Sequence, residues 1–540
     1  MKKNGKRKEA SGVIPKLCGG DIELGNFILG RKARGSTSFE ASRAALSEID
    51  GLPGEERSRS TACDCEMCQR SRTLGANGRT SISESRVGFN PQDWGRKYLP
   101  ANGGCVYIDL EHLELCLPEV VSAWDWVACW QAMIRISQRA MRAANEKMPR
   151  GQKLQLLANN SDGRGNSYGS HLNFLISRRA WDNIFHRRIH QMLYLASFQA
   201  SSIVYTGQGK VGSENDVADV EFQLSQRADF FERLVGSQTT TNRPIINSRD
   251  ESLCGDTEEM ARLHVIFFDN TLCHAATLLK VGVMQIILAM IEAGRVNVNL
   301  ILDDPVESLT RWSHDPQLET RAAMTSGKHI TAVELQMLFL EEAKEFVQSG
   351  ACCGAVPRAE EIIALWEDTL LKLAAKDFDA LASRLDWVLK LAILQQVINE
   401  RPELSWDSPE IKHLDHLYSS LDEEEGLYWV YERGGLVERV VADERIEHFT
   451  ASPPEDTRAW TRAMLLRAVE RDAIADVDWD EIRFRVEAQR FRAKYRRLEM
   501  SNPLGMTRAV AESAFERSET LDELLDALET QEESPAQLAQ

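Results

Sequence analysis

Segments with the composition of β-strands dominate the first half of this 540-residue chain, and segments with helical periodicity dominate the second. The strand candidates are short runs rich in β-branched and aromatic residues, at 105–109, 154–157, 203–205, 222–224 and 263–268. A chain that places its strands first and its helices second is typical of the α+β class. We expect more than one domain, because a single hydrophobic core rarely grows to this length.

Helical periodicity is clearest in three stretches, at 122–145, 357–376 and 378–399. A fourth helix is marked at both ends, because Thr331 and Glu334 form a capping box before it and Gly350 stops it. The sequence therefore predicts a second half built mainly from long helices.

The net charge of the chain is −18. Such an acidic chain disfavours binding to nucleic acid or to an anionic membrane, and we expect neither partner. The longest apolar run, 281–291, is too short to cross a bilayer and predicts a buried helix that ends at Gly294. The 11 cysteines and a basic start with no apolar stretch after it predict a cytoplasmic protein with reduced thiols.

Composition also suggests how the chain is divided into regions. Residues 1–14 are predicted to be a disordered basic tail. Residues 15–452 should form the large domain, with an irregular loop insertion at about 35–100 that is rich in Gly, Ser, Arg and Asn. Two prolines follow Ser452, so 453–540 should form a small C-terminal domain and an acidic tail.

Cys63, Cys65 and Cys68 lie inside the predicted insertion with the spacing C-x-C-x-x-C. A tetrahedral zinc site needs a fourth ligand, and the sequence has no second C-x-x-C pair nearby. A metal site, a redox-active pair and ordinary loop thiols all fit this spacing, so the role of the three cysteines stays open.

Acidic and apolar residues alternate in the segment 19–25. If it is a strand, Asp21 and Glu23 lie on one face and Ile22 and Leu24 on the other. Two carboxylates on one face repel each other unless a cation lies between them, and magnesium prefers such oxygen ligands. The segment predicts a magnesium site, although alone it also fits a half-exposed edge strand with two surface acids.

A second strand candidate repeats this pattern. Tyr107, Asp109 and Glu111 fall on one face of it, and Glu114 follows shortly after. Asp109 and Glu114 can lie on either side of a metal ion and a reacting centre. The segment therefore predicts a second set of cation ligands.

Polar and basic segments further along carry groups that a nucleotide site needs. The Gly-rich run 159–165 lets the backbone approach a phosphate closely, and His171 and His264 can ligate a metal. Arg227 and Arg249 carry the planar guanidinium group that binds phosphate oxygens. Taken singly, each of these residues is also typical of a structural histidine or a plain ion pair.

Five of these segments together resemble one family. They read NGGCVYID at 102–109, LQLLANNSDGRGNSYGSH at 154–171, FQLSQRAD at 222–229, RPIINSRDE at 243–251 and RLHVI at 262–266. Two later segments, RLDWVLK at 384–390 and LSWDSPEIKHLDHLY at 404–418, extend the set. It resembles the Pup-ligase and Pup-deamidase family over roughly residues 15–500.

The resemblance implies a glutamine-synthetase-like catalytic domain, in which a curved antiparallel sheet with flanking helices forms a cradle, and a small C-terminal domain. The cradle would hold ATP, or ADP plus phosphate, and Mg²⁺. Asp109 would be the catalytic residue, acting as nucleophile or base, and Arg227, Arg249 and Trp479 would contact the nucleotide. The metal-site residues implied by position are Asp21, Glu23, Tyr107, Glu114, His171 and His264.

The sequence is more similar to the deamidase/depupylase branch than to the ligase branch. The similar features are the long insertion, the five-residue step from Asp109 to Glu114, and the segment SIVYTGQGKVG at 202–212. That branch converts a C-terminal Gln of the modifier to Glu and cleaves the isopeptide bond to a substrate lysine. RPIINSRDE at 243–251 is nearer the ligase branch, which forms that bond with ATP, so a ligase is the alternative.

Two departures from the family pattern keep a non-catalytic, modifier-binding protein as a further alternative. Cys105 replaces an arginine that contacts nucleotide, and Asp21 replaces the usual glutamate. The expected partners are a Pup-like modifier, acidic and disordered until bound, and the proteins conjugated to it. The basic run 483–497 can form the docking groove for the modifier or one face of a solvated amphipathic helix. The sequence leaves the oligomeric state open.

Overall fold

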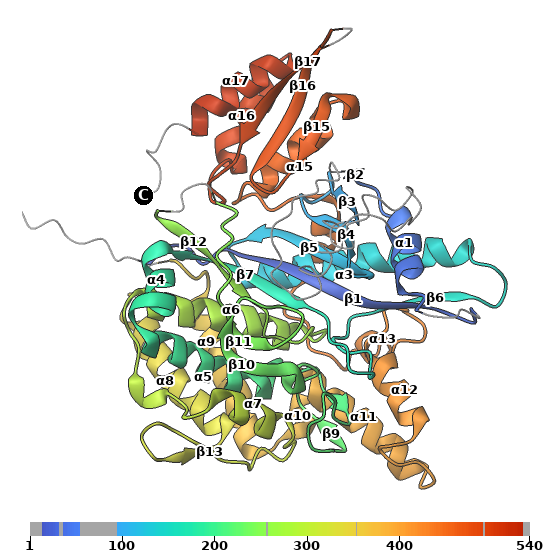
Figure 1. Ribbon diagram of the computed structural model, residues 1–540, viewed down its shortest axis with the longest axis vertical. Coiled ribbons are helices and arrows are strands. Elements are labelled where there is room, and N and C mark those ends of the chain that lie inside the picture. The colour runs from blue at the N-terminus through green and yellow to red at the C-terminus, as the bar shows by residue number, and fades with distance from the viewer. Residues whose placement is uncertain are drawn as a thin grey trace, which may run out of the picture.

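The computed structural model describes residues 13–31, 36–53, 94–254, 258–352, 354–489 and 492–532. The predicted disordered tail lies almost wholly outside these residues. So does most of the predicted insertion, including Cys63, Cys65 and Cys68. Figure 1 shows a main sheet across the middle of the molecule, a thick helical layer on one side of it, and a smaller sheet with helices on the other.

The main sheet has eight strands in the order β12-β7-β1-β5-β4-β3-β2, and β6 also pairs with β1. All these pairings are antiparallel. The long strand β1 pairs with β5 along one edge and with β7 and then β6 along the other. The strands are β1 Cys18–Leu29, β2 Leu52–Pro53, β3 Trp94–Tyr98, β4 Cys105–Asp109, β5 His112–Val120, β6 Lys153–Leu157, β7 Ser170–Ser177 and β12 Met260–Val265.

One face of this sheet is apolar and packs on helices. Ile22, Leu24 and Leu115 are fully buried there, in the main hydrophobic core that also contains α3 (Ala123–Glu146) and α6 (His274–Glu292). By length and composition α6 could cross a membrane, but it is buried along its whole length in this core. Because side chains alternate in a strand, the acidic residues of β1 and β5 must occupy the opposite face.

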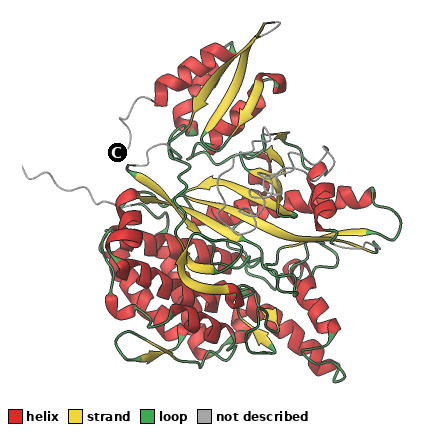
Figure 2. Cartoon of the chain, viewed as in Figure 1, coloured by secondary structure: helices red, strands yellow, loops and turns green. Residues whose placement is uncertain are grey.

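The predicted α+β class is confirmed, and Figure 2 shows how the strands and helices separate into layers. The predicted helix at 122–145 is α3, and the predicted buried helix at 281–291 lies within α6. The capping box of Thr331 and Glu334 is present at the start of α8, with both of its hydrogen bonds formed.

The other helices between the main sheet and the C-terminal part are joined partly by short loops and partly by segments that contain strands. They are α4 Arg178–Asp182, α5 Ile189–Thr206, α7 Pro305–Ser313, α8 Ala332–Gln348, α9 Ala359–Ala375, α10 Phe378–Leu381, α11 Asp386–Glu400, α12 Pro409–Tyr418, α13 Leu427–Arg433 and α14 Asp443–Ala451. Three small strand pairs accompany them: β8 Lys210–Val211 with β9 Phe222–Gln223, β10 Phe231–Gly236 with β11 Arg243–Asn247, and β13 Ala322–Ala323 with β14 His329–Ile330.

Three of the predicted elements were wrong. The strand expected at 203–205 is the last turn of α5, because a short apolar run cannot distinguish a strand from a buried helix. The helix expected at 378–399 is broken into α10 and α11, where the Asp386 carboxylate accepts hydrogen bonds from the distant Leu272 and Cys273 amides. Part of the region expected to be irregular forms the amphipathic helix α1 (Ser38–Ser47).

The C-terminal part consists of α15 Ala459–Ala468, β15 Ile474–Val477, β16 Glu481–Gln489, β17 Arg492–Glu499, α16 Arg508–Arg517 and α17 Leu521–Glu532. Its apolar residues form a second hydrophobic core, which also takes in Tyr98, Cys105, Tyr107 and Cys116 of the main sheet. The division at 452–453 stays a prediction, and this shared core ties the residues after it to the polar face of the sheet.

The described residues of the basic run, 483–489 and 492–497, lie in the paired strands β16 and β17, so the alternative of an amphipathic helix was wrong. Ile482, Phe484 and Leu498 are fully buried, which follows the two-residue period of a strand. Arg496 pairs with three acidic residues of α17, and Arg497 pairs with Glu481 and Glu499. Arg496 and Arg497 are therefore neutralised within the chain, and Arg483 also pairs with Asp476.

Candidate active site

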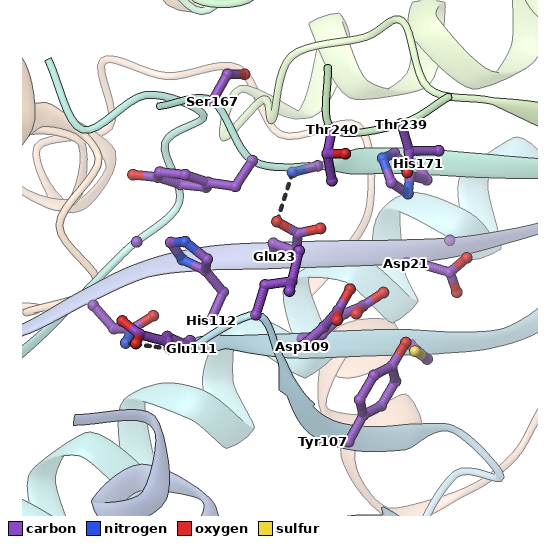
Figure 3. A pocket seen from close by; sticks show the side chains of 18 of the residues that line it. Asp21, Glu23, Tyr107, Asp109, Glu111, His112, Ser167, His171, Thr239 and Thr240 are labelled. Atoms are coloured by element: carbon purple, nitrogen blue, oxygen red, sulfur yellow. Dashed lines mark hydrogen bonds between the residues drawn. The ribbon is translucent and has the colours of Figure 1, made fainter. Parts of the chain in front are cut away.

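A cavity of about 1690 Å³ lies over the polar face of the main sheet. Its floor is formed by β1, β4, β5 and β7, and its walls include the 159–169 loop and residues 476–479 of the C-terminal part. Figure 3 shows Asp21, Glu23, Asp109 and Tyr107 pointing into this space from the strands below. Nine of the ten predicted site residues line the cavity, and Arg227 is the exception.

The strand register explains why residues far apart in the sequence meet here. Directly paired residues in an antiparallel sheet point to the same face. Glu23 is paired with Glu114 across β1 and β5, and Glu114 is paired with Tyr107 across β5 and β4. On the other side of β1, Asp21 is paired with His171. These pairings place the predicted ligands in neighbouring rows on one face.

Two groups of potential ligand atoms result from this arrangement. In the first, atoms of Glu23, Asp109 and Glu114 lie within 4.8 Å of one another, and in the second the same holds for Asp21, Glu114 and Cys116. Glu114 is 4% exposed, and its Oε2 has no hydrogen-bond partner among the residues that the structure describes. A buried, unsatisfied carboxylate oxygen between other carboxylates fits a bound divalent cation.

The electrostatics of Glu114 lead to the same conclusion. Burial raises the pKa of its carboxyl well above the ordinary value, and the neighbouring Asp109, Asp21 and Glu23 raise it further. The Tyr107 hydroxyl hydrogen-bonds to this carboxyl, and burial keeps the pKa of Tyr107 well above its usual range. A cation at this point would favour the ionised carboxylates, because it compensates both the burial and the mutual repulsion.

The two predicted histidines lie together on β7 and β12, with ring centroids 5.0 Å apart. Burial, together with nearby arginines, lowers the pKa of both imidazoles well below the ordinary value, so both are neutral and able to ligate a metal. Asn173 links them to the acidic group, because its Nδ2 donates to Asp21 Oδ2 at 2.7 Å and its Oδ1 lies 2.8 Å from His264 Nδ1. A side-chain amide oxygen accepts, so Nδ1 of His264 carries the proton and Nε2 is the metal-competent atom.

Asp109 is held by a strained turn. It ends β4 and is paired with His112 at the start of β5, so only Leu110 and Glu111 form the turn, with φ values of 43° and 79°. Such left-handed residues are costly for non-glycine side chains and are common at functional sites. The Glu111 carbonyl accepts hydrogen bonds from Asn26 Nδ2 and from Ser42 Oγ of α1. These contacts fix the turn, and with it the position of Asp109.

The three predicted nucleotide contacts differ in their placement. Arg249 and Trp479 line the cavity, and Trp479 packs edge-on against Tyr98 at 5.8 Å between ring centroids. Arg227 is 1% exposed and lies outside the cavity lining, where its guanidinium donates to the Tyr168 and Ile266 carbonyls. Burial, with a contribution from Arg243, lowers the pKa of Arg227 to about 9.

Comparison with known protein families shows to which family the chain belongs. The model of one family, described as "Pup-ligase protein", matches residues 33–483. This chain belongs to the Pup-ligase family. Among its relatives, the depupylase of Acidothermus cellulolyticus is 36% identical over 79% of this chain and 82% of its own length. The Pup deamidase/depupylase of Mycolicibacterium smegmatis is 36% identical over 71% of this chain and 74% of its own length.

The Pup-ligase family also includes relatives with the opposite activity. The Pup–protein ligase of Acidimicrobium ferrooxidans is 35% identical over 74% of this chain and 86% of its own length. The solved complex of Pup with its ligase PafA is similar in fold, with a TM-score of 0.74, 22% identity, and 96% and 93% of the two chains covered. The structure thus has the fold of a Pup ligase, while the names of its relatives divide between hydrolysis and ligation.

Several residues of this Pup-ligase family member were missed by the sequence analysis. Arg243 lines the cavity and donates to the Thr239 and Ser167 carbonyls. Asn173 follows the predicted His171 by two residues, so the strand period alone could have placed it on the same face. Cys116 follows Glu114 by two residues in the same way.

The C-terminal wall of the cavity is anchored by a buried ion-pair group, which is a second feature that the sequence analysis missed. Glu119 at the end of β5 pairs with Arg458 at 2.8 Å and with Arg462 at 2.5 Å. The Arg462 guanidinium also lies 4.7 Å from the Trp479 ring centroid and donates to the Trp479 carbonyl. Trp479 is therefore positioned through Arg462 by a residue of the main sheet.

Proposed function

We propose that this chain is an ATP- and Mg²⁺-dependent deamidase and depupylase that acts on a Pup-like protein modifier. Water would convert the C-terminal Gln of the modifier to Glu with release of ammonia, and would cleave the isopeptide bond to a conjugated lysine. The observation that carries this proposal is the position of Asp109. Its carboxylate adjoins Glu23 and Glu114 on the floor of a cavity large enough for a nucleotide and the end of a peptide.

The proposed chemistry centres on Asp109. Its carboxylate would attack the carbonyl carbon of the amide, or remove a proton from an attacking water. The fixed turn at Leu110 and Glu111 would hold the carboxylate at a constant position during the reaction. A fixed position speeds such a step, because the reacting groups are already oriented toward each other.

The other residues would bind and orient. The carboxylates of Glu23, Asp109 and Glu114 would hold the cation, which supplies Lewis-acid polarisation when bound. Arg249 would face the phosphates or the developing oxyanion, and Trp479 would contact the nucleotide at the C-terminal wall. Arg227 would act indirectly, by supporting the 159–169 loop through the Tyr168 carbonyl.

Two features support hydrolysis over ligation: the five-residue step from Asp109 to Glu114 and the long segment inserted before β3. A ligase that joins the modifier to a lysine is the alternative, and the ligase-like RPIINSRDE segment, which forms β11 and the cavity residue Arg249, supports it. A protein that only binds the modifier would share the fold and differ in lacking turnover.

One assay with three substrates separates these functions. The chain is incubated with ATP and Mg²⁺ and with a Gln-ended Pup, a Pup–lysine conjugate, or a Glu-ended Pup plus an acceptor protein. Intact mass then reports conversion of Gln to Glu, cleavage, ligation or no reaction. We expect conversion and cleavage; ligation alone would favour the alternative.

Asp109→Asn tests the proposed catalytic residue. The amide is a poor nucleophile and base, so we expect turnover to fall by about 10³-fold or more while the fold is kept. The matched control is Asp526→Asn on the exposed helix α17, which should leave turnover unchanged. Turnover of Asp109→Asn within tenfold of the wild type would contradict the assignment.

A further inference from the structure

Cys116 is a cysteine on the floor of a cavity whose other floor residues suit a hard cation. It follows Glu114 by two residues on β5, so both side chains point to the same face. Across the sheet it is paired with Asp21 on β1 and with Cys105 on β4. The strand register, and not proximity in the sequence, brings the thiol to the carboxylate of Asp21.

The geometry of this group is that of a metal site. Ligand atoms of Asp21, Glu114 and Cys116 all lie within 4.8 Å of one another. Ligands about 2.0–2.3 Å from a tetrahedral zinc-class ion lie about 3.3–3.8 Å apart, so the three ligand atoms would have to approach one another by up to about 1 Å to share one ion. Asn173 holds the Asp21 carboxylate through a 2.7 Å hydrogen bond, which orients it as partners of metal ligands do.

The buried oxygen of Glu114, which is shared by both ligand groups, also points to a ligand at this place. Glu114 is 4% exposed, it lines the cavity, and its Oε2 has no hydrogen-bond partner within the described part of the chain. Cys116 is itself only 2% exposed. Arg96 and Arg262 also line this cavity and act on Cys116 and Asp21 respectively. A divalent cation held directly between the thiol and the two carboxylates would offset the burial of Glu114 and the repulsion between the carboxylates.

The two ligand groups differ in chemistry although they share Glu114. The group of Glu23, Asp109 and Glu114 offers oxygen atoms only, as Mg²⁺ prefers. The group of Asp21, Glu114 and Cys116 adds a sulfur, which Mg²⁺ avoids and zinc-class ions bind strongly. A thiol becomes a thiolate when it coordinates such an ion.

We propose that Cys116, with Asp21 and Glu114, forms a second cation position that selects a thiophilic divalent metal of the zinc class over magnesium. This position adjoins the oxygen-only position around Asp109. The inference rests on the proposed function because both place cations in the same cavity. It concerns metal binding alone and does not require that the modifier binds. A zinc-class ion at this position would compete with Mg²⁺ for Glu114.

The test uses the full-length chain, freed of metal by a chelator and kept reduced with a phosphine. Cys63, Cys65 and Cys68 are replaced by serine throughout, so that their thiols cannot contribute. Co²⁺ is then titrated in, and thiolate-to-metal charge-transfer absorption is recorded. We expect a band that saturates at one Co²⁺ per chain, that Zn²⁺ abolishes by displacement, and that millimolar Mg²⁺ leaves in place.

Cys116→Ser should abolish the band and weaken Zn²⁺ binding by at least about tenfold, since even indirect partners of metal ligands are worth about 10–100-fold in affinity. Cys105→Ser is the matched control, because Cys105 lies directly across the sheet from Cys116 but belongs to neither ligand group. It should keep the band. Near-ultraviolet circular dichroism shows whether each variant is folded.

A second measurement needs no variant at Cys116. Zn²⁺ should protect the Cys116 thiol from alkylation, read by peptide mass spectrometry, and Mg²⁺ should not. Three results would each overturn the proposal and leave Cys116 as a packing residue. They are the absence of a charge-transfer band, a band that survives Cys116→Ser, and equal alkylation of Cys116 with both metals. Failure of the proposed function is distinguishable, because it would appear as absence of Pup turnover with Mg²⁺ whatever the Co²⁺ titration shows.

Discussion

Replacing Glu119 by Gln should destabilise the junction between the main sheet and the C-terminal part. Glu119 is 7% exposed, and it pairs with Arg458 and Arg462, which are 2% and 0% exposed. The amide keeps the shape of the side chain and removes its charge. Two buried guanidinium groups then lose their carboxylate, which is the costly way to break a buried ion pair.

The magnitude follows from the pKa of Glu119. Burial alone would raise this pKa, but Arg462 and then Arg458 outweigh burial and lower it from the ordinary 4.5 to about 2. A separation of about 2.5 between the unfolded and folded pKa values corresponds to about 3 kcal/mol of unfolding free energy at neutral pH. Because the folded pKa is the lower one, this contribution is complete above pH 4.5 and is lost as the pH falls towards 2.

Denaturant unfolding followed by tryptophan fluorescence measures the effect, since Trp460 and Trp479 both belong to or pack on the second core. We expect Glu119→Gln to lower the unfolding free energy by about 3 kcal/mol at pH 7, with a smaller difference at pH 3. Glu447→Gln is the control, because Glu447 also contacts two arginines but its side chain is 55% exposed, and exposed pairs are worth at most about 1 kcal/mol. Equal losses in the two variants would refute the reasoning.

Three further predictions concern the cavity floor and its supports. Gly25→Ala should cost about 1–3 kcal/mol of stability in thermal melting, because its Cβ would lie 2.3 Å from Asn159 Oδ1. Gly19→Ala is the control and should change stability little, because the nearest atom to its Cβ would be 4.0 Å away. Arg227→Lys should lower the unfolding free energy by about 1–3 kcal/mol, because the hydrogen bonds to the two carbonyls are lost. Arg249→Lys should leave the stability of the free protein unchanged and weaken the thermal stabilisation that nucleotide provides. Glu111→Gly should raise the unfolding free energy by about 0.5–1 kcal/mol, because glycine adopts a φ of 79° without strain; a loss of stability would show that the turn is not strained.

The sequence predicted the composition of the cavity floor because the strand period leaves little freedom. Asp21 and Glu23 share a face in any strand that contains both, and Ile22 must then face the core, as it does. Helix boundaries set by local chemistry were equally accessible, as the capping box of Thr331 shows. These features depend on neighbours within a few residues.

Predictions failed where distant contacts decide the outcome. The run at 203–205 is helical because α5 is buried among other helices, which overrides the preference of its β-branched residues. The basic run at 483–497 pairs as a hairpin, and Arg496 is neutralised by acids from α17, which no local pattern connects to it. Nothing in the neighbouring sequence distinguishes Glu119 from an exposed acidic residue, because its partner Arg462 is distant in the chain.

By itself the sequence determined that Asp21 and Glu23 share a strand face and where the helices α3 and α8 begin. It also determined that the carboxylates, histidines and arginines lie in segments typical of one family. Only the tertiary structure decided which of them meet. The register of β1 against β5 and β7 places Asp21 beside both His171 and Cys116, and burial removes Arg227 from the cavity while Arg249 stays in it. The physical reason is that period and propensity act within a few residues, whereas pairing register and burial depend on the whole core.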